Sequence, residues 1–301
     1  MSSFEKIFLR VLNQESIRKL AFELVAHRWV AGNNLEDAIE RARILNSRGI
    51  AAIINHVGEH ITSSEQGEKE SKEYFRIIDA LVANNIRASI SLKPSQLITT
   101  KNVDDLVKAL EPIVKKAQKN DIIVCVDMED SSCTQMTIDT YKILFCAKGY
   151  NNLQIVIQAY LHRTTKDLEE LEKIGAKVRI CKGAYRTESP DVVIKGEENI
   201  CKAFAYQLKT ILINGKLSLI SVATHDQDII RKVKWLDETD LDLKFEFQML
   251  IGMNDRLMYE LAKDGYVISA YVPYGNNWIP YFYRRVRENK DYIAKGIKSL
   301  L

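Results

Sequence analysis

The chain has 301 residues, and its 43 basic and 40 acidic side chains give a formal net charge of +3. These charges are interspersed, which excludes the clustered basic surface of a nucleic-acid-binding protein. No apolar run approaches the about 18–20 residues that span a bilayer, and the N-terminus has no signal-peptide pattern. The 5 cysteines form no C-x-x-C pair, so we expect a soluble cytoplasmic protein with free thiols.

The first 49 residues predict helices, because residues 4–13, 15–32 and 34–49 each have an amphipathic pattern. Ser16 and Asn34 are plausible N-caps for the second and third of these helices. No Pro-, Ser- or Gly-rich linker follows them. We therefore expect residues 1–49 to form a helical cap that packs on a larger domain of residues 50–301.

Eight short apolar runs follow the predicted cap, as expected of strands buried on both faces of a parallel sheet. They are IAAIINHVGEH, RASISLKPS, DIIVCVDMED, LQIVIQAYL, AKVRICKGAY, LSLISVATHD, LKFEFQMLIG and YVISAYVPYG. Amphipathic stretches such as residues 102–120 and 164–175 lie between them. This alternation predicts a closed (β/α)8 barrel, whose chemistry lies at the C-terminal ends of the strands.

Polar side chains stand at the C-terminal ends of these runs, where a barrel holds its active site. They are Lys93, Asp127, Gln158, Lys182, His225, Gln248 and Tyr271.

The first run ends in an H-x-x-E-H pattern that begins at His56 and ends at His60. A zinc site of this type needs a helix that brings both histidines onto one face. Here the pattern follows a predicted strand and contains Gly58, so we favour Glu59 as a residue that lines the barrel mouth. No metal site is predicted.

A G-x-G-x-x-G phosphate loop is absent, so a Rossmann cofactor site is not predicted. If a nucleotide binds, helix N-termini and loop amides at the barrel mouth must hold it. Gly183 would let the backbone approach a phosphate, and Arg179 would supply charge. The alternative is that Arg179 and Lys182 are solvated cations at a strand end.

The third run ends in the acidic segment Asp127-Met128-Glu129-Asp130. The segment could be a metal site, a charge partner or a helix N-terminus. Asp130 is well suited to be the N-cap of the helix that follows. Lys93 would be the neighbour of Asp127 across the sheet. We favour a substrate contact over a structural ion pair for these two residues.

Arg284 and Arg285 lie on the helix predicted after the last strand, with Glu288 three and four residues later. Glu288 is therefore able to orient either guanidinium group. A guanidinium fork matches a carboxylate or a phosphate. A surface charge cluster is the alternative, but the aromatic residues that precede the pair count against it.

Seven motifs, in order and spacing, resemble the proline dehydrogenase family over roughly residues 50–290. They are SLKPSQL, VDMEDSSCTQMTIDTY, IQAYLHRT, VRICKGAY, VATHD, FEFQMLIG and YVPYGNNWIPYFYRRVREN. The resemblance implies a (β/α)8 barrel with non-covalently bound FAD that oxidises L-proline to Δ1-pyrroline-5-carboxylate. It also implies a membrane quinone as electron acceptor, at most peripheral contact with the inner face of the membrane, and a separate pyrroline-5-carboxylate dehydrogenase as partner.

The resemblance also assigns roles to individual residues. Asp127 and Arg179 are implied as catalytic residues, with Arg179 on the N5 side of the flavin. The implied substrate contacts are Lys93, Tyr185, Leu250, Tyr271, Arg284, Arg285 and Glu288, with the two arginines as the carboxylate clamp. The implied FAD contacts are Met128, Gln158, Arg179, Lys182, Gly183, Ala184, Thr224, His225 and Gln248.

The departures from the family pattern are Ile251, where an aromatic residue or His is expected, and Pro94 after Lys93, where Leu is frequent. Three alternatives stay open. The barrel could prefer 4-hydroxyproline, act as a Schiff-base aldolase through Lys93 or Lys182, or serve as a non-catalytic proline or flavin sensor. The aldolase lacks a desolvated lysine pocket, and the intact site residues count against the sensor.

Overall fold

The computed structural model describes residues 22–23, 26–58, 60–183, 189–238 and 243–288. Eight parallel strands form a closed barrel in the order β1 to β8, and β8 pairs with β1. The strands are β1 (Ala51–His56), β2 (Ala88–Leu92), β3 (Val124–Val126), β4 (Leu153–Gln158), β5 (Lys177–Cys181), β6 (Leu219–Ala223), β7 (Phe245–Leu250) and β8 (Ile268–Tyr274). The predicted barrel is thereby confirmed.

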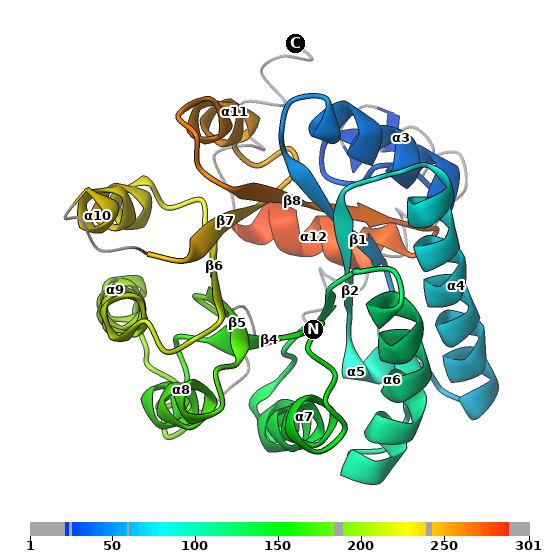
Figure 1. The fold of residues 1–301 in the computed structure, drawn as a ribbon, viewed down its shortest axis with the longest axis horizontal. Helices are drawn as coiled ribbons and strands as arrows, with labels where there is room; N and C mark the ends of the chain where they lie inside the picture. Colours follow the sequence, from blue (N-terminus) through cyan, green and yellow to red (C-terminus); the bar gives the residue numbers. More distant parts are fainter. Residues whose placement is uncertain (1–21, 24–25, 59, 184–188, 239–242, 289–301) are drawn as a thin grey trace.

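Helices alternate with the strands and most of them form a ring around the outside of the barrel, whereas α12 lies inside this ring in the view of Figure 1. They are η1 (Ala26–Arg28), α3 (Leu35–Asn46), α4 (Ser64–Ala83), α5 (Pro94–Leu97), α6 (Val103–Gln118), α7 (Ser131–Lys142), α8 (Thr164–Lys173), α9 (Glu197–Asn214), α10 (Gln227–Asp237), α11 (Asp255–Lys263) and α12 (Trp278–Glu288). A π-helical turn, η2 (Ile143–Ala147), continues α7.

The third predicted N-terminal helix is confirmed as α3, and Asn34 is its N-cap. The Asn34 side chain accepts a hydrogen bond from the backbone N–H of Asp37, and the Asp37 carboxylate closes a capping box. Ala38, Ala42 and Leu45 of α3 lie in the same hydrophobic core as the barrel strands. The first predicted helix and Ser16 lie outside the described residues, and the division at residue 49 stays a prediction.

A second apolar cluster holds α12 against the N-terminal part of the chain. The rings of Trp29 and Phe282 lie 5.5 Å apart, and those of Phe22 and Trp278 also lie 5.5 Å apart. Trp29 Nε1 donates to the backbone oxygen of Gly252 at 3.0 Å, after β7. The N-terminal segment therefore links the helix that carries the arginine pair to the end of a barrel strand.

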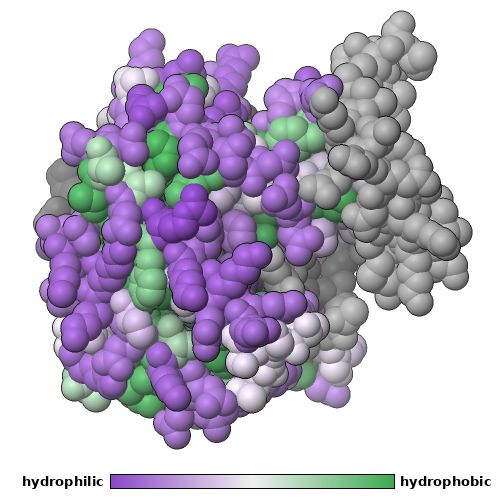
Figure 2. Space-filling view, turned by 90° about the vertical axis from the view of Figure 1, so that its right-hand side faces the viewer, coloured by the Kyte–Doolittle hydropathy of each residue, from purple (hydrophilic) through white to green (hydrophobic). Residues whose placement is uncertain are grey.

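The outer surface is largely hydrophilic. Figure 2 shows the face formed by the right-hand side of Figure 1, where polar side chains dominate and apolar ones are scattered. This distribution is typical of amphipathic helices that bury one face against the barrel. In the part of the chain that the structure describes, no helix is both long and apolar enough to cross a bilayer.

The barrel interior is polar near its centre, in contrast to the branched apolar layers usual in this fold. Gln154 on β4 donates to Ser221 on β6 at 2.7 Å, and Arg179 on β5 donates to Ser91 on β2 at 3.2 Å. These contacts join strands that are not neighbours, so the four side chains point inward. Such a network must be satisfied internally, because buried unpaired polar groups are costly.

Candidate functional site

The carboxylate of Asp127 is the centre of the candidate site. It follows β3 and is nearly buried, with 7% of its surface exposed. It accepts four hydrogen bonds, from Ser91 Oγ at 2.8 Å, Lys93 Nζ at 3.3 Å, Arg179 Nη1 at 2.8 Å and Tyr271 OH at 2.8 Å. The barrel thus joins the ends of β2 and β3 to the middle of β5 and of β8.

The charges of this cluster determine its protonation. Burial by itself would raise the pKa of Asp127, but Lys93 and Arg179 outweigh burial and hold that pKa below its usual range. Burial and the negative charge of Asp127 raise the pKa of Tyr271 well above its usual value. Asp127 is therefore an ionised carboxylate that binds two cations. Tyr271 remains protonated, and its hydroxyl group donates a hydrogen bond to Asp127.

Arg179 is held on two sides. Its Nε donates to Oε1 of Gln248, and its Nη1 donates to Asp127. Its Cζ atom lies 5.6 Å from the centre of the Tyr271 ring, within cation–π range. Nη2 is buried and has no hydrogen-bond partner among the described residues. A buried guanidinium donor without an acceptor is costly, so this atom is suited to a ligand.

Lys182 lies on the loop after β5 and is bound by two carboxylates. Its Nζ lies 2.8 Å from Glu197 Oε1 and 2.9 Å from Asp226 Oδ2. Burial would lower the pKa of Lys182, but these two acids raise it above its usual value. The sequence interpretation missed both partners. The predicted flavin contact of Lys182 stays a prediction.

Gly183 has a φ of +106°, a conformation that L side chains rarely adopt. A Cβ atom at Gly183 would also lie 2.1 Å from the ring of Tyr160. Glycine is therefore required at this turn, as expected where backbone approaches a ligand closely. The next two predicted contacts, Ala184 and Tyr185, lie outside the described residues.

His225 follows β6 and is neutral at physiological pH. Its Nε2 accepts a hydrogen bond from the backbone N–H of Leu250 at 3.0 Å, so the proton resides on Nδ1. Nδ1 is buried and has no hydrogen-bond partner in the described part of the chain. Burial, helped by the charge of Arg285, lowers the pKa of His225 to about 4.

This lowered pKa predicts a pH dependence of stability. An unfolded histidine titrates near about 6.5. Between about pH 6.5 and the folded pKa of about 4, the unfolded state binds more protons than the folded state. The free energy of unfolding is therefore highest above about pH 6.5 and decreases as the pH is lowered towards about 4. We expect His225→Gln to remove a slope of about 1.4 kcal/mol per pH unit in this window.

Denaturant unfolding measured from pH 7.5 to pH 5 checks this expectation. The matched control is His162→Gln, which changes an exposed histidine. Equal pH dependence in the His225→Gln variant and the unaltered protein would contradict the assignment.

Helix α12 brings Arg285 to the same end of the barrel. The Arg285 Cζ atom lies 5.2 Å from the centre of the Tyr281 ring, and its charge acts on His225. Arg285 therefore lies near the ends of β6 and β7, as a ligand-binding group at the mouth would. The side chains of Arg284 and Glu288 lie outside the described residues, so the clamp stays a prediction.

The acidic segment after β3 contributes a second contact that the sequence interpretation missed. The carboxylate of Glu129 accepts hydrogen bonds from the backbone N–H of Ser95 at 2.9 Å and from its hydroxyl at 2.5 Å. Gln158 Nε2 donates to the backbone oxygen of Glu129 at 2.7 Å, while Met128 is buried. These contacts fix the loops after β2, β3 and β4 relative to one another.

Thr224 and the acidic residue after His225 are also placed by hydrogen bonds. Thr224 is buried, and its hydroxyl accepts from the backbone N–H of Asp226 at 3.1 Å. Asp226 caps α10 by accepting from the backbone N–H of Asp228 at 2.9 Å. These two hydrogen bonds fix the backbone of the turn after β6 on the C-terminal side of His225.

The H-x-x-E-H pattern begins in β1, so the helical geometry of a zinc site is missing. His56 Nδ1 lies 2.7 Å from Glu70 Oε2 on α4, and the imidazole ring lies 5.2 Å from that of Tyr274. Glu59 lies outside the described residues. Among the residues with described positions, no three His, Cys, Asp or Glu side chains form a group that could hold a metal.

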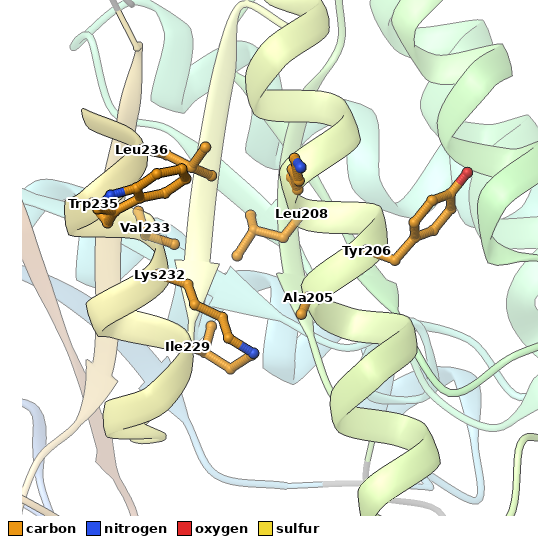
Figure 3. A pocket seen from close by; sticks show the side chains of 9 residues that line it. Ala205, Tyr206, Leu208, Ile229, Lys232, Val233, Trp235 and Leu236 are labelled. Atoms are coloured by element: carbon orange, nitrogen blue, oxygen red, sulfur yellow. The ribbon is translucent and has the colours of Figure 1, made fainter. Parts of the chain in front are cut away.

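A separate cavity of about 270 Å³ lies on the outside of the barrel, between α9 and α10. Leu208 of α9 and Lys232 of α10 point into it (Figure 3). Its lining is mainly apolar and includes none of the predicted site residues. We therefore place the chemistry at the barrel mouth, around Asp127.

A buried cluster of charged side chains near the C-terminal strand ends is typical of (β/α)8-barrel enzymes. The chain belongs to the proline dehydrogenase family, which it matches over residues 38–295.

Individual relatives cover nearly the whole chain. Proline dehydrogenase 1 of Bacillus subtilis subsp. natto is 33% identical over 300 residues, which cover 97% of this chain and 98% of the relative. Proline dehydrogenase 2 of Bacillus subtilis strain 168 is 32% identical, with 94% and 92% covered. Proline dehydrogenase of Deinococcus radiodurans is 30% identical, with 98% and 97% covered.

Solved structures share the fold. Proline utilization A from Bdellovibrio bacteriovorus, inactivated by N-propargylglycine, superposes with a TM-score of 0.85 at 20% identity. The match covers 96% of this chain and 35% of the solved chain, so this protein corresponds to about a third of that larger one.

Proposed function

We propose that this protein is an FAD-dependent proline dehydrogenase that oxidises L-proline to Δ1-pyrroline-5-carboxylate. The observation that carries the proposal is the convergence of Lys93, Asp127, Arg179 and Tyr271 at the mouth of a barrel that belongs to this family. Electrons would then pass to a membrane quinone through peripheral contact with the inner face of the membrane. A separate pyrroline-5-carboxylate dehydrogenase would consume the product.

The residues at the mouth fit a non-covalently bound flavin. Two buried donors, Arg179 Nη2 and His225 Nδ1, have no hydrogen-bond partner among the described residues, and a flavin ring carries carbonyl and ring-nitrogen acceptors. Gly183 has a positive φ of +106°, a backbone conformation that glycine adopts readily and that would let the turn approach a ligand closely. We propose that Met128, Gln158, Lys182, Ala184, Thr224 and Gln248 complete the FAD site.

When bound, the flavin supplies the hydride acceptor. The protein side chains position the substrate. Proline offers a carboxylate, a ring nitrogen and methylene groups, so we assign the carboxylate to Arg284 and Arg285, with Glu288 bracing them. We assign the ring to Leu250, Tyr185 and Tyr271. Hydride departure from C5 is favoured when the substrate nitrogen has lost its proton.

Asp127 suits an orienting role better than that of a base. Its low pKa and its four hydrogen-bond donors make it a poor acceptor of the substrate proton. It instead fixes Lys93, Arg179 and Tyr271 before the substrate arrives. Arg179 would favour the electron-rich reduced flavin electrostatically.

Two measurements test the proposed function. Acid precipitation of the purified protein should release free FAD into the supernatant. Steady-state assays with L-proline should reduce a quinone analogue or an artificial dye. A colourless protein without affinity for added FAD would contradict the flavin site, and NAD reduction by the pure protein without dye would contradict the quinone acceptor.

A further inference from the structure

Beneath Arg179, the barrel interior holds a carboxylate that the proposed mechanism does not use. Glu246 lies on β7, and its Oε1 accepts from Ser221 Oγ at 2.6 Å and from Gln248 Nε2 at 2.5 Å. Its Oε2 accepts from Ser269 Oγ at 2.7 Å. Both oxygens are therefore engaged by inward-pointing side chains of β6, β7 and β8.

Gln248 lies between Arg179 and Glu246 and joins them by two hydrogen bonds. Arg179 Nε donates to Gln248 Oε1, and Gln248 Nε2 donates to Glu246. A flipped Gln248 amide would place its NH2 group against the guanidinium, which has only donors, and its oxygen against the carboxylate. Glu246 and Arg179 thus both select the same orientation of the amide between them.

The orientation of Gln248 matters because, among the described residues, the hydrogen bonds of the Arg179 side chain are made by two of its atoms, Nε and Nη1. Asp127 and Ser91 fix Nη1, and Gln248 fixes the Nε side of the guanidinium plane. Together they determine where Nη2, the buried donor without a partner among the described residues, points.

We propose that Glu246 is a positioning residue, which acts through Gln248 to set the direction of the Arg179 Nη2 atom, a donor without an acceptor in the described part of the chain. The inference rests on the proposed function, since that function assigns Arg179 to the flavin. Glu246 touches neither substrate nor cofactor in this account. Its role is to keep one donor aimed at the place where the flavin would bind.

The charge of Glu246 has a second consequence. Burial opposes the charged form of Arg179, and Glu246 is one of the groups whose electrostatic effect counteracts burial and raises the pKa of Arg179, after Cys125, Asp127 and Tyr271. Removing this negative charge makes the surroundings of Arg179 more positive, which favours a reduced, electron-rich flavin. Glu246 should therefore lower the reduction potential of the bound flavin as well as position the guanidinium.

The test uses the holoenzyme and the substitution Glu246→Gln, which keeps the size of the side chain. We expect the rate of flavin reduction by L-proline to fall about tenfold, because the neutral amide oxygen holds the Gln248 N–H less strongly than a carboxylate does. We also expect the flavin reduction potential, measured without proline, to rise. The matched control is Ser269→Ala, which removes a donor to the same carboxylate without altering Gln248, and should change both quantities little.

A double-mutant cycle tests whether Glu246 acts through Gln248. In a Gln248→Leu background, Glu246→Gln should have little further effect on the reduction rate, while the rise in reduction potential, which does not depend on Gln248, should remain. An undiminished effect on the rate in that background, or an equal loss in Ser269→Ala, would overturn the positioning role. So would an unchanged rate and potential in Glu246→Gln. If the unaltered protein binds FAD but proline does not reduce it, the proposed function itself fails.

Discussion

Asp127→Ala is expected to destabilise the protein by about 3–5 kcal/mol, the usual cost of breaking a buried ion pair from one side. The substitution leaves Lys93 and Arg179 without their shared counter-charge. It also removes the acceptor for the hydroxyl groups of Ser91 and Tyr271. We expect kcat/KM for L-proline to fall by at least about a hundredfold, because two charge-assisted hydrogen bonds that orient the site are lost.

Denaturant unfolding and steady-state kinetics measure the two effects separately. Asp130→Ala is the matched control. Asp130 belongs to the same acidic segment but lies outside the cluster: it caps α7 by accepting from the backbone N–H of Ser132, and it forms an exposed ion pair with Lys101 at 3.8 Å. That cap should contribute about 1 kcal/mol to stability and little to catalysis. If Asp127→Ala is no less stable than Asp130→Ala, the central role of Asp127 is wrong.

The lowered pKa of Asp127 adds a pH signature. Its contribution to stability is present above the unfolded pKa of about 3.9 and is lost as pH falls through the lower folded pKa. Asp127→Ala should therefore reduce the acid sensitivity of stability below that pH.

Arg284→Lys and Arg285→Lys should each lower kcat/KM by about a hundredfold. Each hydrogen bond to a charged group contributes about 1.5–3 kcal/mol, so one lost bidentate arm costs about 3 kcal/mol. Lysine retains the charge but not the planar fork that matches a carboxylate. Glu288→Ala should be milder, because it loosens the predicted clamp without removing either arginine.

Inhibition by a proline analogue that keeps the ring carboxylate provides the measurement. The inhibition constant should rise in both arginine variants and less in Glu288→Ala. Unchanged inhibitor affinity in both arginine variants would show that the carboxylate binds elsewhere.

The sequence predicted the barrel and the meeting of its strand ends, because side chains that follow parallel strands must gather at one end. The Lys93–Asp127 contact follows from this rule and is confirmed. Their functional roles stay predictions. Pro94, a departure from the family pattern, takes the first position of α5, where its fixed φ and missing N–H are well tolerated.

The missed contacts have physical reasons. One partner of Lys182, Glu197, lies at the start of α9, and no spacing rule connects it to β5. The other, Asp226, follows the neighbouring strand β6, and the rule that strand ends gather would have found it. Glu246 was missed because a strand buried on both faces gives little indication of which residues face the interior. The available signal was an acidic residue between two phenylalanines, Phe245 and Phe247, within an apolar run. The π-helical turn η2 has no sequence signal that we recognise.

The most direct test of the central claim is the addition of L-proline to the purified, FAD-containing protein without oxygen. The proposed function predicts that the yellow flavin absorbance bleaches, and that an added quinone analogue restores it. A protein that binds FAD but keeps its full yellow absorbance at saturating L-proline would contradict the assignment.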